Sequence, residues 1–203
     1  MKSELEARLQ ANIDRVRGLV LLYGRAAPGR GRSDVSSTDL LRAAVTFLHA
    51  SCEDLIRGVT SWKLPRIANV DRLAELPLGG VASDDRPGPI KFDLQLLAEH
   101  HRQRTVQDII GISVEEALER STFNNPPELH RALDRLDLAG PWLGPHKRSL
   151  VPLMMRRHWI VHRLDRNRSS GRGQHVARSL ARSTVERWTK AVEDFGRDLL
   201  SRC

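Results

Sequence analysis

The chain has 203 residues, enough for one domain with a buried core, and its 40% hydrophobic and 29% charged residues are typical of a folded protein rather than a disordered one. A formal net charge of +8 and a pI of about 10.4 favour a polyanionic partner such as RNA, DNA or an acidic protein. Two cysteines exclude a disulfide framework, and 4% aromatic residues disfavour an aromatic platform for stacking bases.

The N-terminal segment is not expected to act as an export signal. Residues Met1–Gln10 are charged and amphipathic and lack the apolar core of a signal peptide. No stretch of the sequence approaches the roughly 18 apolar residues that a membrane span needs. We therefore expect a cytoplasmic protein that does not enter a membrane, with Cys52 and Cys203 kept reduced.

Apolar residues at intervals of three and four predict two long helices at the start of the chain. The first spans Ser3–Tyr23 and the second Asp39–Trp62, with Ser36 or Ser37 as a cap. The basic segment 24–37 between them contains Gly and Pro. It is expected to be a solvated loop, with phosphate contact as the alternative.

A series of shorter elements follows. One short helix is expected within 66–80, and a loop rich in Gly, Pro and Asp over 77–90 separates it from a helix over 91–103. Two capping pairs then predict two short helices that meet at Gly111, and these pairs are Thr105 with Asp108 and Ser113 with Glu116.

The last third of the chain contains three more helices. One opens at the sequence NNPP, which starts at Asn124, and closes at Gly140. A longer one begins near His146, and a final one covers Val176–Arg202 after a basic Gly-rich loop at 166–174. Because no segment alternates as a strand, the chain is predicted to be all-α. It should form a single domain over residues 1–203, a bundle of four to five longer helices with short helices inserted.

The sequence RRHWIVHRLDRN, residues 156–167, ends the helix that begins near His146. Counted at about 100° per residue, Arg157 falls in the middle of the apolar stripe of this helix, while His158, His162 and Asp165 share a neighbouring face. A guanidinium keeps its proton, so its placement among Leu and Val requires a paired anion or an anionic ligand. The stripe consists of Leu150, Leu153, Met154, Ile160, Val161 and Leu164.

Arg157 and His162 resemble the R-x(4–6)-H signature of the HEPN superfamily, in which a polar residue directly follows the arginine. The upstream sequence DLLRAAVTFLHASCEDLIR, together with RRHWIVHRLDRN, is similar to the branch called RiboL-PSP-HEPN, which has an acidic residue on the earlier helix. The resemblance implies a HEPN-like bundle and a metal-independent endoribonuclease that acts as a homodimer and leaves a 2′,3′-cyclic phosphate and a 5′-hydroxyl. It also implies a toxin or phage-defence role, with an antitoxin or defence-system protein as partner.

The residue types of the motif suit RNA cleavage. Histidine transfers protons near neutral pH, so His162 is the candidate for acid and base work, and Arg157 is the candidate for binding the scissile phosphate. His158 fills the polar position of the motif and can orient the phosphate or share the proton transfer. Glu53 is the candidate anion near Arg157, and Asp165 is the candidate for holding His162 in one tautomer. No cofactor is expected.

Basic residues around the motif are candidates for RNA contacts, because guanidinium groups and Gly-rich backbone can follow a chain of phosphates. His158 and His162 also have the i, i+4 spacing of a metal pair. The glutamate of an HExxH motif and a third ligand are missing, which disfavours a metal. The RNA-binding candidates are Arg156, Arg163, Arg166, Arg168 and Arg172.

Two other interpretations stay open. The chain can be a non-catalytic dimeric HEPN module that binds RNA, a nucleotide or a partner protein through the same basic cleft, with Arg157 and Glu53 forming a structural ion pair. It can also be the toxin of a pair silenced by a nucleotidyltransferase. Tyr23, the single tyrosine, lies far from the motif in the sequence, so modification of a tyrosine has little support.

Overall fold

The computed structural model describes residues 1–27, 35–74, 76–79, 94–166 and 177–203. Within these residues every regular element is a helix, apart from one isolated antiparallel bridge between Arg166 and Ala177, so the all-α prediction is confirmed. Expectations for 28–34, 80–90 and 167–174 lie outside the described residues. The helices are α1 (Lys2–Ala26), α2 (Val35–Lys63), α3 (Leu94–His101), α4 (Val106–Arg120), α5 (Pro126–Arg135), α6 (Leu143–Arg163) and α7 (Arg182–Ser201), with the short 3-10 helices η1 (Leu64–Arg66) and η2 (Val70–Leu73).

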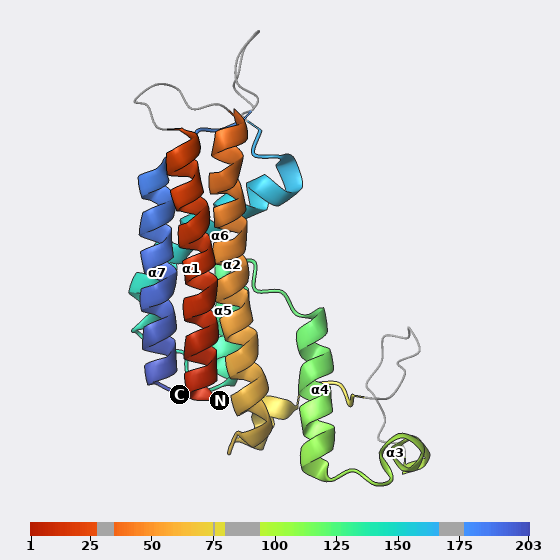
Figure 1. Ribbon diagram of the computed structural model, residues 1–203. Helices are drawn as coiled ribbons and strands as arrows, with labels where there is room; N and C mark the ends of the chain where they lie inside the picture. Colours follow the sequence, from red (N-terminus) through yellow and green to blue (C-terminus); the bar gives the residue numbers. More distant parts are fainter. Residues whose placement is uncertain (28–34, 75, 80–93, 167–176) are drawn as a thin grey trace.

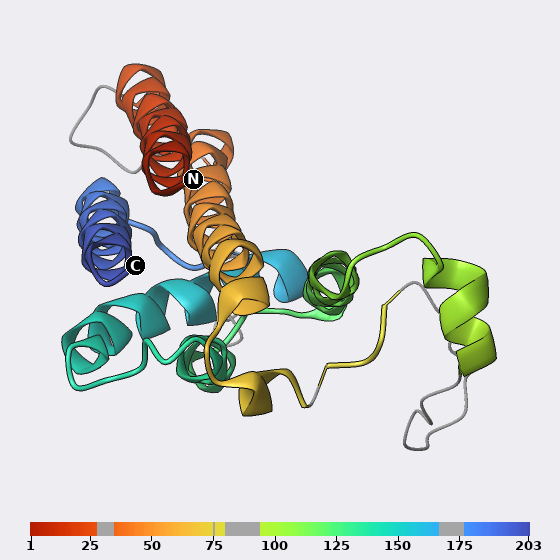
Figure 2. The same ribbon diagram turned by 90° about the horizontal axis from the view of Figure 1, so that it is seen from below.

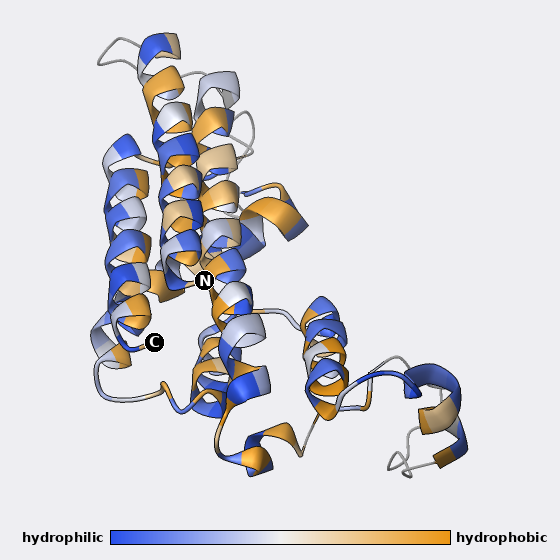
Figure 3. Cartoon of the chain, turned by 60° about the horizontal axis from the view of Figure 1, so that its bottom comes forward, coloured by the Kyte–Doolittle hydropathy of each residue, from blue (hydrophilic) through white to orange (hydrophobic). Residues whose placement is uncertain are grey.

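Four longer helices form the bundle. Helices α1, α2 and α7 lie side by side, and α6 packs across α2 and α7 (Figure 1, Figure 2). Apolar and polar residues are interleaved along each helix (Figure 3), as expected for helices with one buried face. The predicted stripes are buried: Leu5, Leu9, Ile13, Val16 and Val20 of α1; Leu41, Ala44, Val45, Leu48, Cys52, Leu55, Ile56 and Val59 of α2; and Val185, Trp188, Val192, Phe195 and Leu199 of α7.

The three helices α1, α2 and α7 approach closely at Gly196 of α7. A Cβ atom at this position would overlap a methyl group of Leu9 and lie 3.1 Å from Cδ2 of Leu55. Leu9 and Leu55 therefore fill the space above the Gly196 backbone, where α1, α2 and α7 meet. None of the helices in the described part of the chain has the length and apolar composition needed to cross a lipid bilayer.

Helix α4 lies beside the far end of α2, and α3 lies beyond it, away from the bundle (Figure 1, Figure 2). The predicted capping box is present, since Thr105 and Asp108 bond reciprocally at the start of α4. The predicted break at Gly111 is wrong, because α4 continues through it to Arg120. A glycine inside a helix costs only about 1 kcal/mol, and Ser113 bonds to the carbonyl of Ile109 within the helix rather than capping a new one.

Several helix boundaries also differ from the predictions. Helix α2 begins at Val35, so Ser36 and Ser37 lie inside its first turn rather than before it. The single short helix expected within 66–80 is replaced by η1 and η2. Helix α7 begins at Arg182 instead of residue 176, because the preceding carbonyl groups accept hydrogen bonds from arginine side chains and are held outside a helix.

We expect Leu9→Ala to lower the free energy of unfolding by about 2–5 kcal/mol, because Leu9 is buried where three helices meet and its removal leaves a cavity. Leu22→Ala on the same helix is the matched control, since Leu22 is 48% exposed and its truncation leaves no cavity. Urea denaturation followed by circular dichroism measures both. Equal losses for the two variants would contradict this assignment of the core.

Candidate functional site

The residues of the motif lie in the last turns of α6 and in the turn that follows. The helix ends in a left-handed turn, with φ of 48° at Leu164 and 54° at Asp165, and the Asp165 N–H donates to the carbonyl of Trp159 over 2.9 Å. A residue in the left-handed conformation is a common way for a helix to end. The turn also carries the chain out of the helical path, so that Asp165 does not continue the face of α6.

Asp165 instead enters the bundle, where it is fully buried. Its Oδ2 atom accepts from Nε of Arg42 at 3.0 Å and from Nη2 of Arg156 at 2.7 Å. The two guanidiniums also donate to backbone carbonyls: Arg42 to Arg178 at 3.0 Å, and Arg156 to Arg178 at 3.1 Å and Ser179 at 2.9 Å. We call Arg42, Asp165 and Arg156 the buried triad. It joins α2, the end of α6 and the segment that leads into α7.

The buried triad corrects two predictions. Asp165 does not orient His162, because the left-handed turn directs its carboxylate to Arg42 and Arg156. Arg156 is not a surface contact for RNA, because only 12% of its side chain is exposed and it serves as a partner of Asp165. Burial lowers the pKa of Arg156, and the negative charge of Asp165 opposes that change.

Arg157 lies at the margin of the apolar face of α6 rather than within it. The buried part of the stripe is limited to Leu150, Leu153 and Met154, and Arg157 itself is half-buried. Farther along, Val161 is 45% exposed and Leu164 is 71% exposed, so the prediction that they belong to the core is wrong. The first half of α6 is therefore covered by the rest of the protein, whereas its last turns are largely exposed. The guanidinium is thus placed where the buried face opens to solvent.

Glu53 of α2 is the carboxylate next to this margin. Its Oε1 atom accepts from the Phe123 N–H at 3.2 Å, and its Oε2 atom lies 3.6 Å from Nδ1 of the buried His49. Burial alone would raise the pKa of Glu53. His49, the Phe123 N–H and the positive charge of Arg157 together lower it below its ordinary value of 4.5. Glu53 therefore connects α2 electrostatically to Arg157 and by a hydrogen bond to the α4–α5 connection.

His158 and His162 are exposed on α6, with ring centroids 4.8 Å apart and ring planes tilted by 46°. They are one helical turn apart, so both rings reach the same patch of solvent. Met155, one turn earlier, is 50% exposed, and Val161 lies next to the rings. We call Met155, His158, Val161 and His162 the histidine face. Imidazoles can exchange protons with a phosphate ester near neutral pH.

The remaining basic candidates divide into two groups. Arg163 and Arg166 are exposed at the end of α6 and can reach a ligand on the histidine face. Arg168, Arg172 and Asn167 lie outside the described residues. No group of three or more His, Cys, Asp or Glu side chains within the described ranges is arranged to hold a metal ion.

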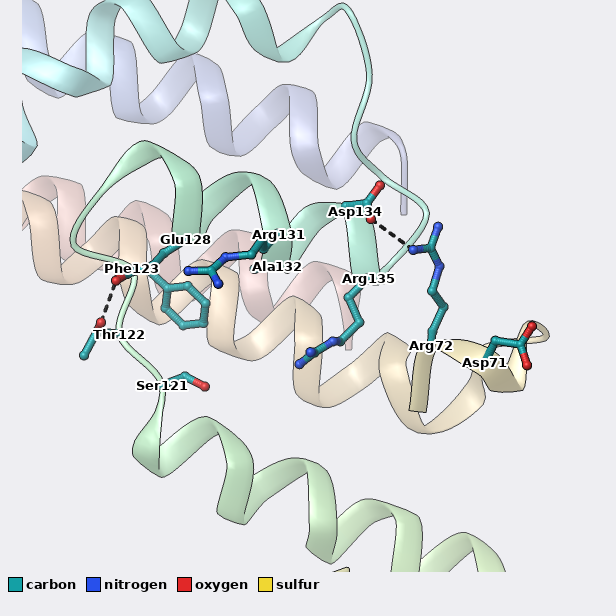
Figure 4. Close-up of a pocket in the computed structure, with 10 residues that line it drawn as sticks. All are labelled: Asp71, Arg72, Ser121, Thr122, Phe123, Glu128, Arg131, Ala132, Asp134 and Arg135. Carbon is teal, nitrogen blue, oxygen red and sulfur yellow. Dashed lines mark hydrogen bonds and ion pairs between the residues drawn. The ribbon is translucent and has the colours of Figure 1, made fainter. Parts of the chain in front are cut away.

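A pocket of about 520 Å³ lies elsewhere, between η2, α5 and the α4–α5 connection (Figure 4). Arg131 and Arg135 extend toward it from α5, but none of the candidate site residues lines it. Two of its carboxylates have partners, since Asp134 pairs with Arg72 at 3.0 Å and Glu128 accepts from the Thr122 hydroxyl at 3.0 Å. Because it shares no lining residue with the histidine face, the pocket is separate from it.

The sequence reasoning missed Arg42, which supplies half of the positive charge paired with Asp165. A signal was present, because Arg42 is followed at intervals of three and four by Val45, His49 and Cys52, all buried. An arginine in register with a buried face needs a buried anion.

Comparisons of the chain with protein-family models, curated proteins and solved structures found no match.

We expect Asp165→Asn to lower the free energy of unfolding by about 3–5 kcal/mol. The substitution keeps the shape of the side chain but, among the described residues, leaves Arg156 without a carboxylate partner and leaves Arg42 with only the exposed Asp39. Asp194→Asn is the control, because Asp194 pairs with Lys190 and Arg197 at the surface and such pairs contribute little. Urea denaturation at pH 7 measures the two losses, and a small loss for Asp165→Asn would argue against a structural role for the buried triad.

Glu53 predicts a pH dependence. Since its pKa is lower in the folded protein than its ordinary value of 4.5, the ionised form stabilises the fold. That contribution is fully present above 4.5 and is lost as the pH falls through the lower, folded value. The difference in unfolding free energy between wild type and Glu53→Gln should therefore be largest at neutral pH and shrink in acid. A difference that grew on acidification would reverse the sign. Glu119→Gln, at an exposed position of α4, controls for the change in net charge.

Proposed function

We propose that this chain is a metal-independent endoribonuclease of HEPN type that acts as a homodimer. The observation that carries the proposal is the pair of exposed imidazoles, 4.8 Å between centroids, on the same helix end as the half-buried Arg157. The resemblance of Arg157, His158 and His162 to the R-x(4–6)-H motif supports the same assignment. A net charge of +8 favours a polyanionic substrate such as RNA.

The proposed reaction is a transfer of the phosphoryl group within the RNA chain. His162, as the base, takes the proton of the ribose 2′-hydroxyl while the 2′ oxygen forms a bond to phosphorus. The bond from phosphorus to the 5′ oxygen breaks, and His158, as the acid, gives that oxygen a proton. Arg157 donates N–H groups to the non-bridging oxygens, where negative charge develops. The products are a 2′,3′-cyclic phosphate and a 5′-hydroxyl end, and no water is consumed.

In this proposal, a second copy of the chain covers exposed apolar surface at the end of α6. Met155 and Val161 of the histidine face are 50% and 45% exposed, and Leu164, in the turn that ends α6, is 71% exposed. Apolar side chains that gather on one surface are typical of a protein contact. A two-fold contact between copies of α6 would cover them and bring two sets of Arg157 and His162 to one groove. We place this activity in the cytoplasm, as a toxin or a defence nuclease that an antitoxin or another system protein controls.

A cleavage assay tests the proposal. Purified protein is incubated with 5′-labelled RNA in EDTA, and products are resolved beside a ladder with 2′,3′-cyclic phosphate ends. We expect cleavage by the wild type and a loss of at least about 100-fold in His162→Ala and in Arg157→Ala, because proton transfer and charge stabilisation each contribute at least that much. His130→Ala, which removes an exposed histidine of α5, should cleave like the wild type.

Other outcomes lead to other conclusions. Equal cleavage by wild type and His162→Ala would remove the catalytic assignment. Loss of cleavage in EDTA would indicate a metal-dependent nuclease. Binding of RNA without products in all variants would favour the non-catalytic dimeric module. Sedimentation of the wild type and of Val161→Asp tests the dimer, which the charged side chain should dissociate.

A further inference from the structure

A second apolar surface lies at the C-terminal end of α1, where α1 packs against α2. Leu21 is 57% exposed and Leu22 is 48% exposed, and Phe47 of α2, 43% exposed, faces the same space. The sequence Gly18-Leu19-Val20-Leu21-Leu22-Tyr23 is apolar on all sides of the helix. Val20 is buried in the core and Leu19 and Tyr23 pack against it, which leaves Leu21 and Leu22 exposed. A helix end that is apolar all round is expected to be covered.

These side chains form a groove rather than a bulge. The hollow between α1 and α2 has a volume of about 480 Å³, with Leu19, Leu21, Leu22 and Phe47 in its walls. Gly18 keeps it open, since no other atom lies within 4 Å of a Cβ built at that position. We call these residues the α1–α2 groove.

Among the residues that the structure describes, the charge at the edge of the groove has one sign, since Arg15 and Arg25 line it and no carboxylate does. Arg15 is held in place, because its guanidinium carbon lies 5.0 Å from the centre of the Phe47 ring. Ten residues of helix separate the two arginines, which corresponds to roughly 15 Å along the axis, or about three turns. The groove thus combines an apolar floor with a positive group near each end.

We propose that the α1–α2 groove binds an acidic amphipathic helix of a partner protein. Two neighbouring helices form a channel into which the side-chain ridge of a third helix packs. A partner helix of about three turns, with apolar residues at i, i+3, i+4 and i+7, fills the floor. Carboxylates on its flanks pair with Arg15 and Arg25. This surface shares no residue with the histidine face, so the proposal does not depend on RNA cleavage.

Three other occupants fit the groove less well. A two-fold contact with a second copy would place Arg15 and Arg25 against like charges. The chain's own segment 28–34, PGRGRSD, has two arginines and one aspartate, so its charge does not complement the edge. A lipid surface is best entered by apolar side chains that protrude from a basic face, and here they line a hollow.

A pair of synthetic peptides tests the proposal. Both are stapled three-turn helices with leucines at i, i+3, i+4 and i+7, and their remaining positions are glutamate in one peptide and lysine in the other. Fluorescence anisotropy with the full chain should show at least 10-fold tighter binding of the glutamate peptide. Leu22→Asp should weaken that binding at least 10-fold. Arg15→Glu combined with Arg25→Glu should reverse the preference between the peptides.

The control separates the groove from general charge attraction. Arg102→Glu combined with Arg104→Glu changes the net charge equally at exposed positions beside α3, and should keep the preference of the wild type. The proposal is overturned if the glutamate peptide binds the wild type, this control and the groove variants equally well. It is also overturned if the peptide does not bind the wild type. Two further results would overturn it. One is self-association of the wild type in sedimentation that Leu22→Asp abolishes, and the other is binding of the wild type to phosphatidylserine vesicles that Leu22→Asp abolishes. Melting curves confirm that each variant is folded.

Discussion

The charge of Asp165 is the constraint on which the end of α6 depends. A carboxylate with no exposed surface is costly to bury, and here it is offset by the guanidiniums of Arg42 and Arg156, 3.0 and 2.7 Å away. Both guanidiniums also donate to the carbonyl of Arg178, and that of Arg156 donates to the carbonyl of Ser179 as well, in the segment between α6 and α7. One buried charge therefore fixes three parts of the chain that are far apart in sequence. Arg178 adds to this connection by stacking 3.8 Å over the ring of Trp159.

Fixing Asp165 inside the bundle determines what remains outside. Since α6 is capped by the left-handed turn at Leu164, its last two turns project His158 and His162 into solvent while Arg156 is drawn inward. Arg157 lies between these two environments, within electrostatic reach of Glu53. Neighbouring arginines thus differ in environment, since Arg156 is held by Asp165 whereas Arg157 is only half-buried.

Much of the fold followed from apolar periodicity. The buried stripes of α1, α2 and α7 match the sequence residue by residue, because intervals of three and four leave little choice of face in helices of 20 residues or more. The capping box at Thr105 was also readable, since it depends on residues three positions apart. The second capping pair, Ser113 with Glu116, misled at Gly111, because the cost of one glycine is smaller than the gain from continuing α4. Periodicity failed at 177–181, where contacts with distant arginines override the local preference for helix.

The sequence by itself determined the helical class, the direction of each buried face and the clustering of Arg157, His158 and His162 on one helix. Only the tertiary structure decided which arginine is buried, where the stripe of α6 stops being covered, and that Asp165 turns toward Arg42. The reason is physical. Helical spacing states the direction in which a side chain points, but burial and ion pairing depend on what the rest of the chain brings to that side. Arg42 and Asp165 are 123 residues apart, so no local sequence pattern indicates that they form an ion pair.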